Sequence, residues 1–335
     1  MFATPSRLAT FLAALLLTAT AHAAERAAAD AQAGELVGPG TISTGLQETS
    51  VALTPDGATL YFMRSDLNES DDTILVSHRR DGRWSAPDVA PFSGRWHDSE
   101  PTLSPDGQRL YFVSNRPPRA DEAPVTASMG GHSFAGTHLW YVARQADGRW
   151  GAPVHVDGAL NDGAMIYNPS VTADGDIYFS AHRPDSGAAY QIYVVHPQGH
   201  GYSLPERVQL GDVARNRMDP AIDPRGRFLV YAGDEGDSLG RADLYIAFRQ
   251  PDGRWGKPER LPGEVNSSAL ENAPSLGPHF GELYVASNRR DLVNFPKPVD
   301  DIASLQQRLQ SPLNGSRNLW RFDIADVLRA HGIER

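Results

Sequence analysis

Charged side chains recur at matched places along this sequence. Carboxylates precede or open several hydrophobic runs, and arginines end the runs that follow. Gathered at one mouth of a fold, such groups would form a polar funnel that binds a charged or hydroxylated ligand or a protein segment. The alternative is that each arginine pairs with a carboxylate of its own or a neighbouring repeat, and recurrence with the repeat favours that pairing. The candidates are Asp98, Glu100, Asp219 and Glu271, with Arg116, Arg183 and Arg289.

The same carboxylates permit a catalytic interpretation. Glycoside hydrolysis needs two carboxyl groups at a suitable separation, one acting as acid and the other as base or nucleophile. In this alternative Asp98, Glu100, Asp219 and Glu271 supply the acid and the base. A catalytic set is expected to break the symmetry of a repeat, whereas these acids recur with it. The sequence therefore favours binding over catalysis.

A serine nucleophile is not expected. The nearest approach to a nucleophile elbow is the segment 131–136, Gly-His-Ser-Phe-Ala-Gly. Ala135 stands where the motif needs its second glycine, and the segment lacks the strand, turn and helix that such an elbow requires. We expect a glycine-rich loop there.

Metal ligands form incomplete patterns. His132 and His138 lie six residues apart, and His97 and His182 could approach the same face. None of these spacings is typical of a metal site. Residues 66–72 place oxygens at alternate positions, as a calcium loop does, but lack the glycine at the sixth place and the glutamate at the twelfth. We therefore expect neither a metal nor a cofactor.

Composition excludes several classes of protein. The 335 residues include 31 Lys and Arg against 41 Asp and Glu, a formal charge of −10, which argues against a nucleic-acid-binding surface. The sequence has no cysteine, which excludes disulfides, thiolate zinc sites, iron–sulfur clusters, cysteine nucleophiles and lipid-modified cysteine anchors. Its 31 glycines and 25 prolines suit a turn-rich all-β protein.

The beginning of the chain has the pattern of a targeting segment. Residues 1–23 carry Arg7, an apolar run and the ending Ala-His-Ala, which is typical of a cleaved secretory signal peptide. Residues 24–33 are expected to form a flexible leader. The remaining sequence contains no apolar run long enough to span a membrane. The expected location is the periplasm or the exterior of the cell.

A repeat organises the remaining sequence. Segment 51–57, Val-Ala-Leu-Thr-Pro-Asp-Gly, matches segments 101–107, 169–175, 220–226 and 274–281. Two β-rich runs follow each copy, and then a turn and a fourth run, seen as Asp-Gly-Arg-Trp at 81–84, 147–150 and 252–255. Short aromatic and β-branched strands bounded by such turns predict antiparallel four-stranded units. Arranged radially, these units make a β-propeller, with the turn tryptophans packed between adjacent blades.

Five copies predict five blades. We expect a single all-β domain over residues 34–335, with repeats near 48–98, 99–166, 167–218, 219–270 and 271–335. The fifth copy ends after its third strand, and residues 34–39 match 82–87. Residues 34–43 are therefore expected to complete the last blade and close the ring. Six blades are the alternative, but the insertions 117–137 and 290–316, of 21 and 27 residues, are too short to contain another blade.

The repeat also carries a family resemblance. Segment 104–116, Ser-Pro-Asp-Gly-Gln-Arg-Leu-Tyr-Phe-Val-Ser-Asn-Arg, with the Asp-Leu-Tyr strand at 243–245 and the Asp-Gly-Arg-Trp turns, resembles the WD-type propeller repeat of the TolB-like family of exported proteins. The resemblance covers roughly residues 34–322. It implies a propeller strongly and a role in protein binding weakly, because one propeller repeat serves many partners.

The loops predict where a ligand would bind. In an up-and-down blade, the loops between the second and third strands share a face with the loops that enter the inner strands. Both long insertions and the acidic stretches 66–72 and 234–243 lie on that side, which we call the elaborated face. The sequence thus favours an exported, non-enzymatic propeller that recognises a protein, peptide or envelope glycan there. The alternative is a glycosidase-like hydrolase that uses the funnel carboxylates.

Overall fold

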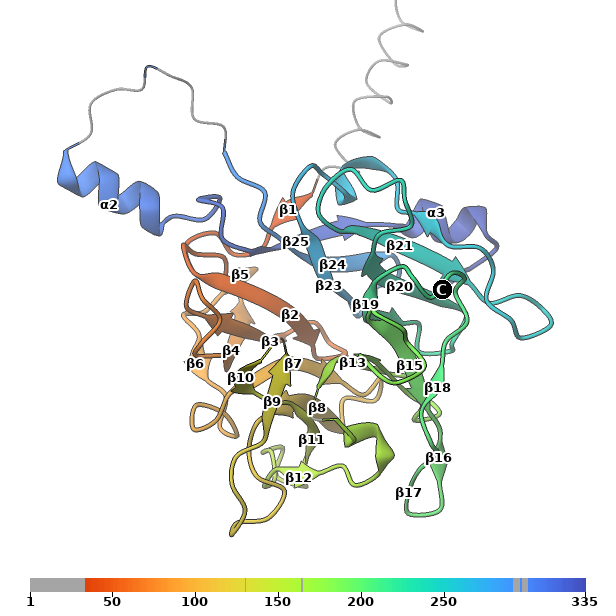
Figure 1. Ribbon diagram of the computed structural model, residues 1–335. Helices are drawn as coiled ribbons and strands as arrows, with labels where there is room; N and C mark the ends of the chain where they lie inside the picture. Colours follow the sequence, from red (N-terminus) through yellow and green to blue (C-terminus); the bar gives the residue numbers. More distant parts are fainter. Residues whose placement is uncertain (1–33, 130, 164, 292–295, 297–300) are drawn as a thin grey trace, which may run out of the picture.

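The protein is a ring of five antiparallel β-sheets (Figure 1). The computed structural model describes residues 34–129, 131–163, 165–291, 296 and 301–335. The predicted five-bladed propeller is confirmed. The signal-peptide and leader predictions fall on residues 1–33, which lie outside the described residues. No helix within the described ranges is long and apolar enough to cross a membrane.

In the first four blades the innermost strand comes first in the sequence, and the fifth blade adds the N-terminal strand at its outer edge. The first blade contains β2 (Gln47–Leu53), β3 (Thr59–Ser65), β4 (Thr73–Arg80), β5 (Arg83–Trp84) and β6 (Asp88–Val89). The second contains β7 (Asp98–Leu103), β8 (Arg109–Ser114), β11 (His138–Ala143) and β12 (Val154–His155). The third contains β13 (Ile166–Val171), β14 (Ile177–Ala181), β15 (Gln191–Val195) and β18 (Glu206–Arg207). The fourth contains β19 (Arg217–Ile222), β20 (Phe228–Gly233), β21 (Asp243–Phe248) and β22 (Glu259–Arg260). The fifth contains β23 (Glu271–Leu276), β24 (Glu282–Ser287), β25 (Asn318–Asp323) and β1 (Glu35–Leu36).

Smaller elements decorate the blades. Two short hairpins are formed by β9 (Thr126–Met129) with β10 (His132–Ala135), and by β16 (Pro197–Gln198) with β17 (Gly201–Tyr202). The helices of the described residues are α2 (Ile302–Gln310) and α3 (Ala325–Ala330), with short 3-10 turns η1 (Ala159–Asn161) and η2 (Gly263–Val265).

The two ends of the described chain meet in the last blade. In β1, Glu35 pairs with Arg321 and Leu36 with Trp320 of β25. The Arg321 guanidinium also contacts the Glu35 carboxylate at 2.6 Å. The N-terminal strand therefore closes the ring, as predicted, and gives β25 an antiparallel partner.

The register of this closing strand differs from the predicted alignment. In the first blade, the outermost strand is Asp88–Val89, which pairs with the middle of β4. Arg83 and Trp84 instead pair with the end of β4 and form a short hairpin with it. Glu35–Leu36 therefore corresponds to Asp88–Val89 and not to Arg83–Trp84. The reason is the tight Asp-Gly turn, which reverses the chain before it returns to the blade.

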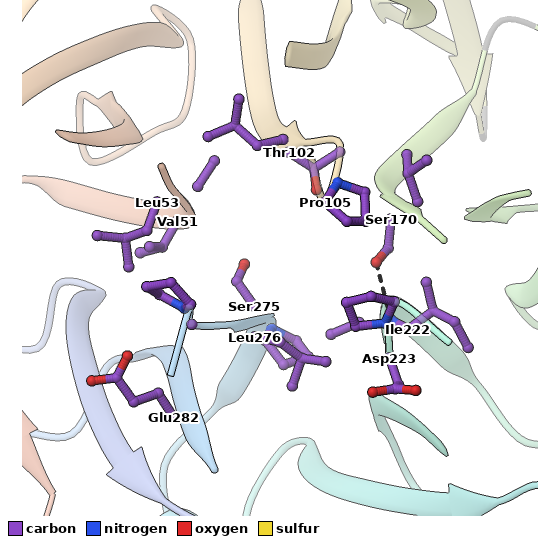
Figure 2. Close-up of a pocket in the computed structure, with 18 of the residues that line it drawn as sticks. Val51, Leu53, Thr102, Pro105, Ser170, Ile222, Asp223, Ser275, Leu276 and Glu282 are labelled. Atoms are coloured by element: carbon purple, nitrogen blue, oxygen red, sulfur yellow. Dashed lines mark hydrogen bonds between the residues drawn. The ribbon is translucent and has the colours of Figure 1, made fainter. Parts of the chain in front are cut away.

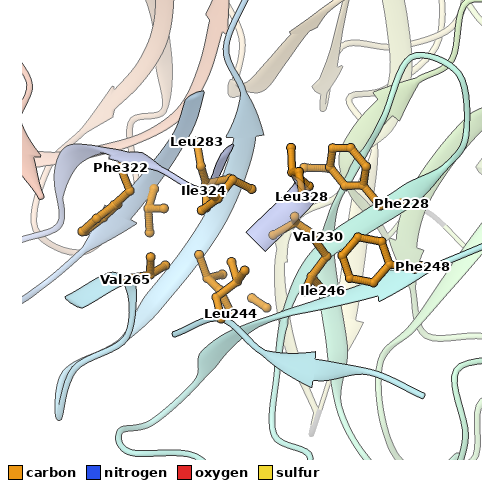
Figure 3. Packing of buried hydrophobic residues seen from close by; sticks show 14 residues of the cluster. Phe228, Val230, Leu244, Ile246, Phe248, Val265, Leu283, Phe322, Ile324 and Leu328 are labelled. Carbon is orange, nitrogen blue, oxygen red and sulfur yellow. The ribbon is translucent and has the colours of Figure 1, made fainter. Parts of the chain in front are cut away.

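The hydrophobic core lies between neighbouring sheets. Figure 3 shows the cluster between the fourth and fifth blades, where Val230 and Leu244 face Leu283 and Phe322, and Leu328 of α3 covers one side. The tryptophans of the turns lie at such contacts, as predicted: Trp150 of the second blade donates from Nε1 to the Tyr61 hydroxyl of the first, at 2.8 Å. Burial of these side chains stabilises the docking of blade against blade.

The recurring Pro-Asp-Gly turns have a shared local cause. In the first blade, Asp56 accepts hydrogen bonds from the Thr54 hydroxyl at 2.5 Å and from the Ala58 N–H at 3.0 Å. Gly57 has a φ of +67°, which glycine adopts without strain. Ser104, Asp106 and Gly107 repeat the arrangement in the second blade. These turns end the inner strands on the face opposite the elaborated one.

Candidate functional site

A β-bulge recurs at the same place in inner strands of the ring. The residue at each bulge has a left-handed backbone although none is glycine, which is unusual for such residues. We call this set the central layer. It consists of Ser50, Glu100, Asn168, Asp219 and Ala273, with φ values of 55, 56, 45, 56 and 46°.

The central layer is joined across the axis by hydrogen bonds. Asn168 donates to Glu100 from its backbone N–H at 2.6 Å and from Nδ2 at 3.2 Å, and Nδ2 also donates to Asp219 at 2.7 Å. Ser50 donates to Asn168 Oδ1 at 3.2 Å, and the Ala273 N–H donates to Asp219 Oδ2 at 2.9 Å. Each blade contributes one member, so the network ties the five blades together at their centre.

Burial controls the protonation of the two acids in this layer. Burial raises the pKa of Glu100 well above its usual range, and the neighbouring Asp219 carboxylate raises it further. Burial also raises the pKa of Asp219, against hydrogen bonds from Ala273, Asn168 and Asn272 that lower it. Both carboxyl groups therefore hold a proton more tightly than exposed acids do.

The other predicted acids lie within their own blades. Asp98 pairs with Arg116 at 2.7 Å, and Glu271 pairs with Arg289 at 3.1 Å, with each carboxylate fully buried. The fourth blade carries the same pair with its charges exchanged, Arg217 with Glu235 at 2.6 Å. These contacts match the alternative in which arginine pairs with a carboxylate of its own repeat.

Arg183 occupies the corresponding place in the third blade. The inner strand there begins with Ile166, and the guanidinium of Arg183 donates to the carbonyl oxygens of Ala159 at 3.1 Å and Leu160 at 3.5 Å. Arg183 thus holds the turn η1 against the blade. The structure brings Glu100 and Asp219 together at the axis and directs Asp98, Glu271, Arg116, Arg183 and Arg289 to partners inside the blades.

A cavity of about 470 Å³ opens above the central layer on the elaborated face. Its wall comes from the loop 66–72, from the end of hairpin β9–β10, and from the residue before β25. We call it the funnel pocket. Its polar and aromatic lining includes Glu69, Asp72, His97, Glu100, Phe134, Tyr167, Asn272 and Arg317.

Several polar atoms of the funnel pocket lack a hydrogen-bond partner within the described residues. They are Asp72 Oδ1, His97 Nδ1, Asn272 Oδ1 and Arg317 Nη2, the last of which forms an ion pair with Glu69 at 2.5 Å. Asp72 is only 6% exposed, and its other oxygen lies 3.4 Å from His97 Nε2. Burial raises the pKa of Asp72. Buried polar groups are normally satisfied, so these atoms point to a polar ligand or to water.

A second cavity, of about 330 Å³, lies on the other side of the central layer. Figure 2 shows its wall, in which Val51, Leu53, Ile222 and Leu276 are joined by prolines of the repeat, including Pro105. We call it the proline pocket. Ser50, Glu100 and Asn168 line both cavities, so the central layer separates the two.

The loop 66–72, whose sequence partly resembles a calcium loop, is held by hydrogen bonds between its own residues. Asp66 accepts hydrogen bonds from the Ser70 N–H at 2.8 Å and from the Ser70 hydroxyl at 2.7 Å. In the part of the chain that the structure describes, no group of three or more histidines and acids is arranged to hold a metal ion.

The remaining chemical candidates also have local partners. Segment 131–136 contains β10, so Ser133 lies on a hairpin, where its hydroxyl is 3.1 Å from that of Ser128. His138 lies 3.1 Å from His155, and burial with this neighbour lowers the pKa of His138 to about 4. His182 packs edge-on against Tyr190.

Sequence reasoning identified Glu100 and Asp219 but missed Asn168 and Ser50. A signal for Asn168 was present, because Glu100, Asn168, Asp219 and Ala273 each precede the proline that opens a repeat copy. The sequence prediction considered charged residues alone, and therefore missed the Asn168 amide and the Ser50 hydroxyl that complete the network.

Comparisons with known proteins support the fold. No family model matches the chain. The uncharacterized peptidase YuxL of Bacillus subtilis (strain 168) is 24% identical over 212 residues, 59% of this chain and 32% of that protein. The chain thus spans about a third of the length of this curated relative.

Two of the solved structures that resemble this chain carry different names. TolB from Acinetobacter baumannii is 18% identical with a TM-score of 0.47, covering 73% of this chain and 50% of that one. An alpha-L-arabinofuranosidase from Lactobacillus brevis is 11% identical with a TM-score of 0.50, covering 83% and 90%. At 11% identity, the likeness to the second structure shows the fold alone.

Proposed function

We propose that this chain is an exported, TolB-like, non-enzymatic β-propeller that binds part of a protein, a peptide or an envelope glycan in its funnel pocket. Export to the periplasm or the exterior is supported by the signal-peptide pattern of residues 1–23. The propeller serves as a rigid frame, and the loops of the elaborated face carry the recognition.

One observation carries this proposal. Asp72 Oδ1, His97 Nδ1 and Asn272 Oδ1 are buried, line one cavity and lack partners among the described residues. A ligand with polar groups would satisfy them, whereas leaving them unpaired costs about 1–3 kcal/mol each. Phe134 and Tyr167 add aromatic surface to the same wall, which suits contact with a sugar ring or a peptide side chain.

The arrangement of the acids supports binding over hydrolysis. A glycosidase presents two carboxyl groups to an open site, one on each side of the scissile bond. Here both oxygens of Glu100 accept hydrogen bonds from Asn168, and both oxygens of Asp219 accept from Asn168 and Ala273. Asp219 is buried within the central layer, at 3% exposure.

A hydrolase remains the second candidate, on one specific observation. Glu100 lines the funnel pocket and holds its proton tightly, which is a property of a general acid. Asp72, in the same pocket, would then have to act as the second carboxyl group.

The proposal is tested by capture of a ligand from envelope extract, alongside a glycan array. The wild-type chain is compared with Asp72→Ala in the funnel pocket and with Asp147→Ala, a matched change in an exposed turn of the opposite face. We expect Asp72→Ala to weaken retention about tenfold or more and Asp147→Ala to leave it unchanged. Equal retention by all three proteins would contradict the proposed site.

A further inference from the structure

Three of the four polar atoms of the funnel pocket without a hydrogen bond can accept one, and the fourth, Arg317 Nη2, is paired with the Glu69 carboxylate. Asp72 Oδ1 and Asn272 Oδ1 are acceptors, and His97 Nδ1 accepts in one of its neutral tautomers. The orientation of Asn272 follows from its neighbour, because its side chain hydrogen-bonds the Asp219 carboxylate, which a carbonyl oxygen would repel. The pocket therefore offers acceptors to a ligand that supplies donors.

The charges around these atoms also favour a ligand that supplies donors. The carboxyl groups of Glu69, Asp72 and Glu100 line the pocket, and of these Glu100, like its neighbour Asp219, holds its proton tightly. The cation on this wall, Arg317, contacts Glu69 at 2.5 Å and is neutralised there. Asp72 lies 3.4 Å from His97 Nε2 and forms no ion pair with an arginine among the described residues. Among the acids of the described pocket, Asp72 is thus the carboxylate whose charge no arginine cancels.

The aromatic side chains of the pocket wall also suit a positively charged ligand. Tyr167 and Phe134 present aromatic rings to the cavity, and an aromatic face attracts a cation. Burial raises the pKa of Tyr167, which keeps its phenol neutral. The cavity of about 470 Å³ has room for a flexible aliphatic side chain.

We propose that the funnel pocket binds the protonated primary amine of a polypeptide, either a lysine side chain or a chain N-terminus. An ammonium group carries three donors and no acceptor, and so matches a set of acceptors with negative charge behind it. A sugar hydroxyl is both donor and acceptor, and would leave its acceptor capacity unused against these atoms. The inference rests on the proposed function and narrows its ligand to a protein or peptide.

The test uses the full chain and small probes of defined charge. Nα-acetyl-lysine methylamide carries the ammonium group, the Nε-acetylated compound removes its charge, and methyl glucoside supplies hydroxyls. Binding is measured by ligand-observed NMR titration at neutral pH. We expect the ammonium probe to bind at least tenfold more tightly than both others, and Asp72→Asn to remove this preference while Asp147→Asn retains it.

The outcomes separate this inference from the proposed function. Equal binding of the lysine probe and its acetylated form would overturn the amine site. If methyl glucoside alone bound, in a manner that depends on Asp72, the amine inference would fail and the binding function would stand. If envelope capture were also insensitive to Asp72, both would fail. The acetylated probe tests the wild-type protein, so the result does not depend on a variant that folds poorly.

Discussion

Asn168 of the third blade holds both carboxylate oxygens of Glu100 of the second. Its backbone N–H reaches Oε2 at 2.6 Å, and its side-chain nitrogen reaches Oε1 at 3.2 Å. The same nitrogen donates to Asp219 of the fourth blade at 2.7 Å. One amide therefore organises two buried acids, and its position between blades makes it a cross-link of the ring.

The first prediction concerns this amide. Asn168→Ala removes the side-chain donor of Asp219 and one donor of Glu100, and leaves buried acceptors unsatisfied. We expect the free energy of unfolding to fall by about 2–4 kcal/mol, measured by urea denaturation. Asn68→Ala, at an exposed asparagine, is the matched control and should change it by less than about 0.5 kcal/mol. Equal stability of the two variants would contradict the cross-link.

The second prediction is a pH dependence of stability. Glu100 has a folded pKa well above its ordinary value of 4.5, because it is buried. The folded protein then binds the proton more tightly than the unfolded chain does. The resulting stability is fully present below pH 4.5 and is lost as the pH rises through the folded pKa.

Glu100→Gln removes this titration. Denaturation midpoints measured from pH 4.5 to pH 8 should therefore fall less steeply in the variant than in the wild type. Glu122→Gln, at an exposed position on the insertion, is the control and should keep the wild-type slope. Parallel curves for wild type and Glu100→Gln would show that Glu100 does not hold its proton in this way.

The separation of Glu100 from Asp98 shows what the sequence could not provide. Both acids were expected in one funnel because they open the same inner strand, and in a regular strand residues two apart would point to the same face. The bulge at Glu100, with its φ of +56°, breaks the alternation. Asp98 then turns to Arg116 inside the blade, and Glu100 turns to the axis.

The fold itself could be predicted from the sequence because it depends on local signals that recur in each repeat. The Pro-Asp-Gly turns fix where each inner strand ends, and the aromatic runs that follow supply its partners. The funnel pocket could not be predicted from the sequence in the same way. Asp72, His97, Asn272 and Arg317 come from the first, second and fifth blades, and their meeting depends on loop paths that no repeat encodes.

The third prediction concerns ring closure. Deleting residues 24–43 removes β1 together with Val37 and Ile42, which are buried against the first and last blades. Loss of these side chains should lower the free energy of unfolding by about 3–5 kcal/mol, seen as a lower melting temperature. Deleting residues 24–33 alone is the control and is expected to leave the melting temperature unchanged. Identical melting of the two truncations would mean that β1 contributes little.

The fourth prediction concerns the buried pair of the second blade. Arg116→Met leaves the Asp98 carboxylate, 0% exposed, without its cation. We expect a loss of about 3 kcal/mol in the free energy of unfolding. Adding Asp98→Asn removes the stranded charge and should recover at least half of the loss, giving a clear coupling in a double-mutant cycle. Additive losses would show that the two side chains do not stabilise each other.

The last prediction separates the binding protein from the hydrolase. A general acid acts on the transition state, so a catalytic Glu100 would give turnover that Glu100→Gln abolishes while the affinity for ligand is retained. Both oxygens of Glu100 are occupied by Asn168, so the carboxyl group is held away from a leaving group. We therefore expect no hydrolysis of aryl glycosides that depends on Glu100, in assays of the wild type beside Glu100→Gln and Asp72→Asn. Turnover by the wild type that disappears in either variant, with binding of the product sugar preserved, would replace the binding function with the enzymatic one.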